Sequence, residues 1–246
     1  IHDSNAIPGK ANKLTARFCD TVLLGFGEAA AHFAPEKQKR VVGTPVRSAL
    51  LKAAAESKED PYEFFGLRPE RKTLLVVGGS QGAKGVNNAV THTLAELDAI
   101  GLQILHITGP SDYQEVCDAY TGKMIRVRSH LAAFCHRMEL AYRIADVAVA
   151  RSGASTLAEL AAFGVPSLLV PYPFAADDHQ TANAAIFDRA GAGIMISQSD
   201  LSPTRLADTV RSLLQNDAKR TAMQQAAKRL AHRDAAERIA DVVAGA

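Results

Sequence analysis

Residues 145–159 carry the clearest candidate for binding chemistry in this chain. A short apolar run at 147–150 is followed by Arg151 and a turn of small residues at 152–155, and the pattern predicts a helix directly after it. A strand that passes straight into a helix leaves backbone N–H groups unpaired at the positive end of the helix dipole. Such a turn is typical of a phosphate-binding site.

Glu159 in this predicted helix allows two interpretations. With Thr156 three residues before it, Glu159 fits a capping box, in which the carboxylate merely bonds a backbone N–H at the start of the helix. Alternatively, an ionised Glu159 at the edge of a ligand accepts hydrogen bonds from two ribose hydroxyls. Both roles stay open at the level of the sequence.

A second candidate is the glycine-rich turn Gly-Gly-Ser-Gln-Gly-Ala at 78–83, which follows a predicted strand. Glycines let the backbone approach a ligand closely, and Ser80 adds a hydroxyl donor. The turn lacks the spacing of dinucleotide-binding and phosphate-loop motifs, and the next strand, at 102–107, is not followed by an acidic residue to hold the ribose of NAD. A purely structural tight turn and the Gly-x-Ser-x-Gly nucleophile elbow of hydrolases are the alternatives.

Two further segments place polar side chains at predicted helix starts. At 171–184, His179 and Gln180 offer donors and acceptors for sugar hydroxyls, although an aspartate that caps the helix also explains the pattern. At 43–47, Arg47 lies where the helix dipole disfavours a cation, so a bound anion would explain its position. A solvated surface arginine is the alternative there.

A regular alternation of strands and helices joins these segments. Between residues 72 and 196, strands that are apolar on both faces alternate with amphipathic helices, which predicts an α/β fold with a Rossmann-like, doubly wound parallel sheet. Ligands of such sheets bind beyond the carboxyl ends of the strands. The predicted strands are 73–77, 102–107, 124–127, 147–150, 167–170 and 193–196. The predicted helices are 46–57, 83–99, 112–120, 134–142, 156–163, 178–190, 203–215, 218–232 and 235–244, with a connector at 58–72.

The first 45 residues do not complete a sheet in this pattern. They contain a short predicted helix at 13–19 and two short strands, at 21–26 and 39–43, with no third strand beside them. Two such strands are marginal alone. We therefore expect their neighbours to lie upstream of Ile1, in a longer protein of which this chain is a piece.

Composition argues against several classes of protein. The 246 residues carry 28 basic and 26 acidic side chains, and a net charge of +2 does not favour nucleic-acid binding. No apolar run approaches the ~20 residues of a membrane span. The three cysteines (Cys19, Cys117 and Cys135) lack metal-ligand spacing and are expected to be reduced. The histidines are scattered and no Asp-x-Asp motif occurs, so no metal site is predicted.

Taken together and in this order, the motifs closely resemble the MurG family of bacterial peptidoglycan N-acetylglucosaminyltransferases. The matching segments are 45–47, 78–83, 151–159 and 177–184. The match at 78–83 favours this family over the nucleophile elbow. The resemblance implies an inverting hexosyltransferase that moves GlcNAc from UDP-GlcNAc to the C4 hydroxyl of undecaprenyl-pyrophosphoryl-MurNAc-pentapeptide. This step converts lipid I to lipid II in peptidoglycan synthesis.

The fold implied by the resemblance is GT-B, with two Rossmann-like domains and the active site between them. Residues 1–45 would end the N-terminal acceptor domain, 46–232 would form the UDP-GlcNAc-binding domain, and 233–246 would pack back on the first domain as a helix. The resemblance also implies a peripheral location on the cytoplasmic side of the bacterial inner membrane. Contacts with lipid I and the membrane, and the histidine general base, belong mainly to the absent part. This chain therefore holds no predicted catalytic residue and is expected to be inactive alone.

The resemblance assigns ten residues to donor binding and implies neither a cofactor nor a metal. Preorganised donors around the diphosphate stabilise the charge that grows on the leaving β-phosphate. The assigned residues are Ser80 and Arg47 at the diphosphate, Cys135 through its main chain at the uracil, Ala154, Ser155 and Thr156 at the helix start, Glu159 at the ribose, and His179, Gln180 and Asn5 at the GlcNAc.

Two other functions remain open. One is a GT-B transferase that uses a different nucleotide sugar or acceptor, since acceptor choice resides largely in the absent domain. The other is a non-catalytic nucleotide-binding module. The chain also departs from the family pattern, because residues 2–5 agree with the family's His-Glu-Gln-Asn only at both ends and Thr44 replaces the asparagine before Pro45.

Overall fold

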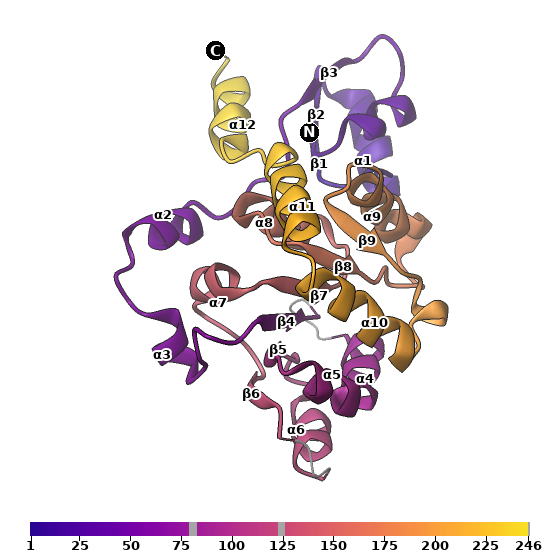
Figure 1. Ribbon diagram of the computed structural model, residues 1–246. Helices are drawn as coiled ribbons and strands as arrows, with labels where there is room; N and C mark the ends of the chain where they lie inside the picture. The colour runs from indigo at the N-terminus through magenta and orange to yellow at the C-terminus, as the bar shows by residue number, and fades with distance from the viewer. Residues whose placement is uncertain (79–82, 123–125, 246) are drawn as a thin grey trace.

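The computed structural model describes residues 1–78, 83–122 and 126–245 and contains two parallel sheets (Figure 1). The larger sheet has the strand order β6 (Arg128–Ala132), β5 (Gln103–Ile107), β4 (Thr73–Val77), β7 (Val147–Ala150), β8 (Ser167–Leu169) and β9 (Gly193–Met195). The chain builds outward from β4 through β5 to β6, then returns to add β7 on the other side of β4. This reversal defines a doubly wound sheet, and the predicted fold class is confirmed.

The strands of the larger sheet are buried on both faces at its centre. Their side chains alternate between two cores, with Leu75 and Ala148 in one and Leu74 and Val147 in the other. All five residues of β4 and all four of β7 are buried. This double burial explains why the sequence shows continuous apolar runs there rather than an alternation of apolar and polar residues.

Helices cover both faces of this sheet (Figure 1). The core that includes Leu75 is formed with α2 (Ser48–Glu56), α3 (Pro61–Phe65), α7 (Met138–Ile144), α8 (Ala154–Phe163), α9 (His179–Arg189) and α11 (Asp217–Arg229). The opposite core is formed with α4 (Lys84–His92), α5 (Leu94–Ile100) and α10 (Pro203–Leu214). The remaining α-helices are α1 (Lys10–Thr15), α6 (Tyr113–Thr121) and α12 (Ala235–Ala244).

One predicted strand is misplaced. Arg126 and Val127 lie outside any strand, and residues 123–125 lie outside the described residues. The strand at this position is β6, which begins at Arg128 and pairs along its whole length with β5. Because β6 is at the edge of the sheet and its side chains are exposed or half-buried, polar residues are tolerated there and the apolar signal is lost.

Two predicted segments also have a different internal structure. The connector predicted at 58–72 contains the short helix α3, whose start is capped by Asp60 through a hydrogen bond from the Tyr62 N–H (2.8 Å). The long helix predicted at 83–99 is divided into α4 and α5 at Thr93, which has non-helical backbone angles. Neither difference moves a predicted site residue.

The smaller sheet contradicts the expectation that the first strands lack a third partner. It has the order β1 (His2–Asp3), β2 (Thr21–Leu24), β3 (Gln38–Val41), all parallel. β1 is two residues long, which is too short to show any periodicity in the sequence. The buried carboxylate of Asp3 accepts a hydrogen bond from the Asn12 amide (2.8 Å), which fixes the loop that follows β1.

Asn183 on α9 joins the N-terminal segment to the larger sheet. Its fully buried amide accepts a hydrogen bond from the Ala6 N–H (2.8 Å) and donates to Asn5 Oδ1 (3.0 Å) and to the Ser152 carbonyl (3.1 Å). At the other end of the chain, Arg238 of α12 donates to the last carbonyl of β3 (2.8 Å). Both contacts hold the smaller sheet against the rest of the chain.

His106 on β5 is part of a buried polar network. Asn87 uses its amide nitrogen to donate to the Thr108 carbonyl (2.9 Å) and to Asp112 Oδ2 (2.8 Å), so its side-chain oxygen accepts from His106 Nε2 (2.9 Å). His106 Nδ1 then accepts from the Tyr120 hydroxyl (3.2 Å). Burial of the neutral ring lowers the pKa of His106 from 6.5 to about 3.

This network predicts a loss of stability in mild acid. Below pH 6.5 the unfolded chain protonates His106 while the folded chain does not, so protonation favours unfolding increasingly as the pH falls towards 3. At pH 5 this cost is about 2 kcal/mol relative to pH 7.5. Urea unfolding at pH 7.5 and at pH 5 measures this change in the free energy of unfolding, for the unsubstituted chain and for His106→Gln. The glutamine can still donate to Asn87. Between pH 7.5 and pH 5 we expect the free energy of unfolding of this variant to fall by about 2 kcal/mol less than that of the unsubstituted chain. Equal falls in the two proteins would contradict the role of His106 in this pH dependence.

Candidate functional site

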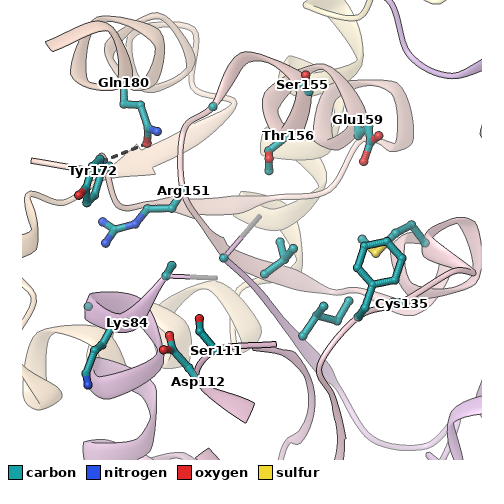
Figure 2. Close-up of a pocket in the computed structure, with 18 of the residues that line it drawn as sticks. Lys84, Ser111, Asp112, Cys135, Arg151, Ser155, Thr156, Glu159, Tyr172 and Gln180 are labelled. Atoms are coloured by element: carbon teal, nitrogen blue, oxygen red, sulfur yellow. Dashed lines mark hydrogen bonds between the residues drawn. The ribbon is translucent and has the colours of Figure 1, made fainter. Parts of the chain in front are cut away.

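A cavity of about 1020 Å³ opens at the carboxyl ends of the central strands. Its wall includes Val77 at the end of β4, Ile107 at the end of β5, Gly153 after β7 and Tyr172 after β8. It therefore lies where the strand order reverses between β4 and β7, which is the position where doubly wound sheets bind ligands. Figure 2 shows the side chains that face this space.

The start of α8 forms one wall of the cavity. The helix begins at Ala154 after Gly153, which has extended backbone angles and provides no side-chain cap. In the described structure the first intrahelical bond runs from the Leu157 N–H to the Gly153 carbonyl (3.0 Å). The N–H groups from Ala154 to Thr156 are therefore available to an anionic ligand at the positive end of the helix dipole.

The capping-box interpretation of Glu159 is wrong. Because α8 begins at Ala154, Thr156 lies inside the first turn and Glu159 in the second, too far along to bond the N-terminal N–H groups. Glu159 instead faces the cavity (Figure 2). Its Oε2 accepts a hydrogen bond from the Tyr142 hydroxyl (2.8 Å), and its Oε1 lies 3.7 Å from Arg47 Nη2.

Arg47 directly precedes α2, which begins two residues after the start predicted at 46, and it also lines the cavity. Its side chain is 67% exposed, so the contact with Glu159 is weak and leaves the guanidinium free to approach a ligand. A carboxylate of the same cavity, that of Glu159, thus lies beside Arg47 at this helix start.

Arg151, which follows β7, places a second guanidinium in the cavity wall. It donates to the Val170 and Pro171 carbonyls (3.1 and 3.0 Å) and to Gln198 Oε1 (2.6 Å), and it lies 5.4 Å from the centroid of the Tyr172 ring. No carboxylate of the described residues forms an ion pair with it, and its burial lowers the pKa of Arg151. The cavity therefore contains a largely buried positive charge, and its hydrogen-bond partners among the described residues are neutral groups.

The glycine-rich turn cannot be placed in the same detail. Gly78 and Ala83 line the cavity, whereas Ser80 and its neighbours 79–82 lie outside the described residues. Lys84, the first residue of α4, is paired with Glu115 (3.1 Å). The role of Ser80 at a diphosphate stays a prediction.

Cys135 lies in the loop that connects β6 to α7 and lines the cavity opposite Arg151 (Figure 2). The predicted helix at 134–142 begins only at Met138, so the main-chain groups of Cys135 are outside helix and strand. Burial raises the pKa of its thiol, which keeps it neutral. The prediction that the Cys135 main chain bonds uracil remains untested by this geometry, although the position suits it.

The residues predicted to contact GlcNAc are not all brought together. Gln180 lines the cavity, and its side-chain oxygen accepts from the Tyr172 N–H (3.0 Å; Figure 2). His179 and Asn5 do not line it, since His179 Nδ1 bonds the Ala176 carbonyl (2.7 Å) and the Asn5 side chain bonds Asn183. Their contact with the sugar stays a prediction.

The alternative explanation of this segment, an aspartate cap on α9, is not observed. Asp178 precedes the helix with a left-handed backbone (φ 54°) and makes no side-chain cap bond to it. Its carboxylate accepts instead from the Thr181 hydroxyl (2.6 Å). Asp177 is also left-handed (φ 51°), a conformation that aspartate adopts more often than most residues with a side chain.

Sequence analysis missed several side chains of the cavity. Tyr142 lies in the middle of α7, where a buried aromatic residue gives no signal other than that of the core. Gln198 follows β9 in a short 3₁₀ helix (Gln198–Asp200) and approaches only in three dimensions. Arg151 was visible as a charged residue directly after an apolar strand, which is an unusual place for an unpaired cation.

Two kinds of feature are absent among the residues that the structure describes. No group of three or more His, Cys, Asp or Glu side chains is gathered there as the ligands of a metal ion would be. Over the same ranges, no helix combines the length and the apolar character that crossing a membrane requires.

The fold and the cavity define a class of protein, the GT-B glycosyltransferases. MurG of Acinetobacter baumannii superposes with a TM-score of 0.78 and 28% identity, over all of this chain and 66% of that one. WaaG, a glycosyltransferase of lipopolysaccharide biosynthesis, superposes with a TM-score of 0.62 at 17% identity, over 92% of this chain and 63% of that one, which shows the fold alone.

The family model of the glycosyltransferase family 28 C-terminal domain matches residues 73–239, and the chain belongs to this family. The UDP-N-acetylglucosamine--N-acetylmuramyl-(pentapeptide) pyrophosphoryl-undecaprenol N-acetylglucosamine transferase of Synechococcus elongatus is 40% identical over 87% of this chain. The chain spans 56% of the length of that relative. The resemblance to the MurG family seen in the sequence is confirmed.

The Arg151 contacts predict that lysine is a poor replacement. Arg151→Lys keeps the charge, but an ammonium group cannot bond two carbonyls and an amide oxygen in the same fork-like geometry. We expect a loss of about 1–3 kcal/mol in the free energy of unfolding, measured by urea denaturation. Arg189→Lys, at a side chain that is 64% exposed, is the control and should change stability by less than about 0.5 kcal/mol. Equal effects of the two substitutions would contradict a structural role for the Arg151 fork.

Proposed function

We propose that this chain is the donor-binding part of an inverting N-acetylglucosaminyltransferase. The complete enzyme transfers GlcNAc from UDP-GlcNAc to undecaprenyl-pyrophosphoryl-MurNAc-pentapeptide, the donor and acceptor in the name of the Synechococcus relative. The acceptor group in this proposal is the C4 hydroxyl of MurNAc. The observation that carries the proposal is the cavity at the strand reversal, in which an uncapped helix start and a carboxylate released from any capping role face the same space. The helix start suits the diphosphate and the carboxylate suits the ribose hydroxyls of a nucleoside diphosphate.

In this proposal the nucleotide lies across the carboxyl ends of β4 and β7. The first N–H groups of α8 and the positive charges of Arg47 and Arg151 hold the diphosphate. Glu159 accepts the ribose hydroxyls, and the main chain of Cys135 bonds the uracil edge. Gln180, at the other side of the cavity, contacts the sugar.

The chemistry is a single displacement at the anomeric carbon. The acceptor hydroxyl attacks C1 of GlcNAc, the bond from C1 to the β-phosphate oxygen breaks, and UDP leaves with both electrons of that bond. Negative charge grows on the β-phosphate, so fixed N–H dipoles and guanidinium groups beside it lower the barrier. A base outside this chain takes the proton of the hydroxyl.

The proposal also gives the parts of the chain their roles. Residues 1–45 are the end of an acceptor domain, 46–232 bind the donor, and 233–246 return to the first domain as a helix. The complete enzyme works as a peripheral protein on the cytoplasmic face of the bacterial inner membrane, where it meets lipid I mainly through residues outside this chain.

Binding of UDP is the direct test. At 100 times its Kd, a ligand that binds only the folded chain adds about 2.7 kcal/mol to the free energy of unfolding. For a chain of this size the melting temperature should rise by roughly 5–10 °C. Thermal unfolding with UDP and, as the control, with ADP measures this effect. No shift with UDP, or the same shift with ADP, would count against a uridine nucleotide site.

Glu159→Gln separates ribose binding from stability. The glutamine can still accept the hydrogen bond of Tyr142, so the melting temperature should stay close to that of the unsubstituted chain. Loss of the carboxylate charge should weaken UDP binding by about tenfold or more, because hydrogen bonds to a charged group contribute about 1.5–3 kcal/mol. Calorimetric titration measures the affinity, with Glu237→Gln on α12 as the control. Unchanged affinity in Glu159→Gln would remove Glu159 from the site.

A further inference from the structure

Tyr142 is a buried residue whose hydroxyl has a specific target in the cavity. The residue is 4% exposed, and the centroid of its ring lies 4.9 Å from the centroid of the Phe163 ring. The hydroxyl donates to Glu159 Oε2 at 2.8 Å. Tyr142 belongs to α7 and Glu159 to α8, so this bond joins two neighbouring walls of the cavity.

The bond restrains a side chain that would otherwise be mobile. A glutamate has three side-chain torsions, and ordering such a side chain on binding costs affinity. Arg47 cannot provide this restraint, because it is 67% exposed and lies 3.7 Å from Oε1. Tyr142 stays a donor at neutral pH, since burial, together with the charge of Glu159, raises the pKa of the phenol well above 10.

The position of Glu159 leaves its acceptor capacity open to the cavity. The side chain is 17% exposed, and among the described residues Oε1 has only the contact with Arg47, at 3.7 Å. Each carboxylate oxygen has two lone pairs, so Oε2 can also accept a second bond while Tyr142 holds it. The hydrogen bond from Tyr142 thus fixes the orientation of the carboxylate, and its remaining lone pairs can accept hydrogen bonds from a ligand in the cavity.

We propose that Tyr142 is a positioning residue, which orients the Glu159 carboxylate towards the ribose hydroxyls of a uridine nucleotide and so sets the preference of the site for ribose over 2′-deoxyribose. This inference rests on the proposed function. It assigns to α7 a direct part in nucleotide selectivity, in addition to its part in the core.

The test compares UDP with 2′-deoxy-UDP in calorimetric titrations of the 246-residue chain and of its variant Tyr142→Phe. Phenylalanine keeps the ring and removes only the hydroxyl. We expect UDP to bind about tenfold more weakly to the variant, and 2′-deoxy-UDP less than about threefold more weakly, so that the preference for ribose falls. In a Glu159→Gln background, Tyr142→Phe should add little further loss, because the two residues act together.

Two controls distinguish positioning from stability. Tyr120→Phe removes another buried hydroxyl bond, to His106, outside the cavity, and should leave the ratio of the two affinities unchanged. Tyr142→Met, which fills the space with flexible apolar atoms, gives the same readout if the phenylalanine variant does not fold. Thermal unfolding of every variant reports its stability independently of binding.

The outcomes are distinct. A reduced ribose preference in the Tyr142 variants, but not in Tyr120→Phe, supports the inference. Suppose that the unsubstituted chain binds UDP, and that the Tyr142 variants either keep its ribose preference or lose affinity for both nucleotides equally. The inference is then overturned, while the proposed function stands. If the unsubstituted chain does not bind UDP, the proposed function fails and the inference fails with it.

Discussion

The reversal of strand order at β4 is the constraint on which the rest of this structure depends. Connections between parallel strands are right-handed, so the crossovers that build the sheet from β4 to β6 and the crossover that returns from β6 to β7 run over opposite faces of the sheet. Neither crossover closes the carboxyl ends of β4 and β7, and the cavity opens between them. The start of α8, the loop with Cys135 and the turn with Tyr172 meet only because each follows a strand that ends at this edge.

The charge distribution of the cavity follows from what solvates each group. Arg151 is held by two carbonyls and an amide, which accept three hydrogen bonds from it without neutralising its charge. Glu159 is held by the Tyr142 hydroxyl, which likewise leaves the carboxylate charged. One cavity thus offers a cation and the dipole of α8 to an anion, and a carboxylate to hydroxyl groups. This combination matches the two halves of a nucleoside diphosphate.

The predictable parts of the fold are those that local sequence determines. β4 and β7 were predicted with their observed bounds, because strands buried on both faces are continuously apolar. β6 was misplaced because an edge strand is chosen by its pairing with β5 rather than by its own composition. In the site, the turn before α8 is visible in the sequence, whereas the bond from Tyr142 to Glu159 joins residues on separate helices and leaves no local pattern. The capping-box motif misled because the helix starts three residues earlier than the motif implies, with Gly153 rather than Thr156 as the N-cap.

The amide of Asn183 has a mechanical consequence. One of its bonds holds the Ser152 carbonyl in the turn before α8, and two others hold the segment that follows β1. A rotation of the smaller sheet about this point would therefore strain the turn before α8 through a buried side chain. By reciprocity, a ligand that stiffened this turn would also stiffen the contact between the two sheets.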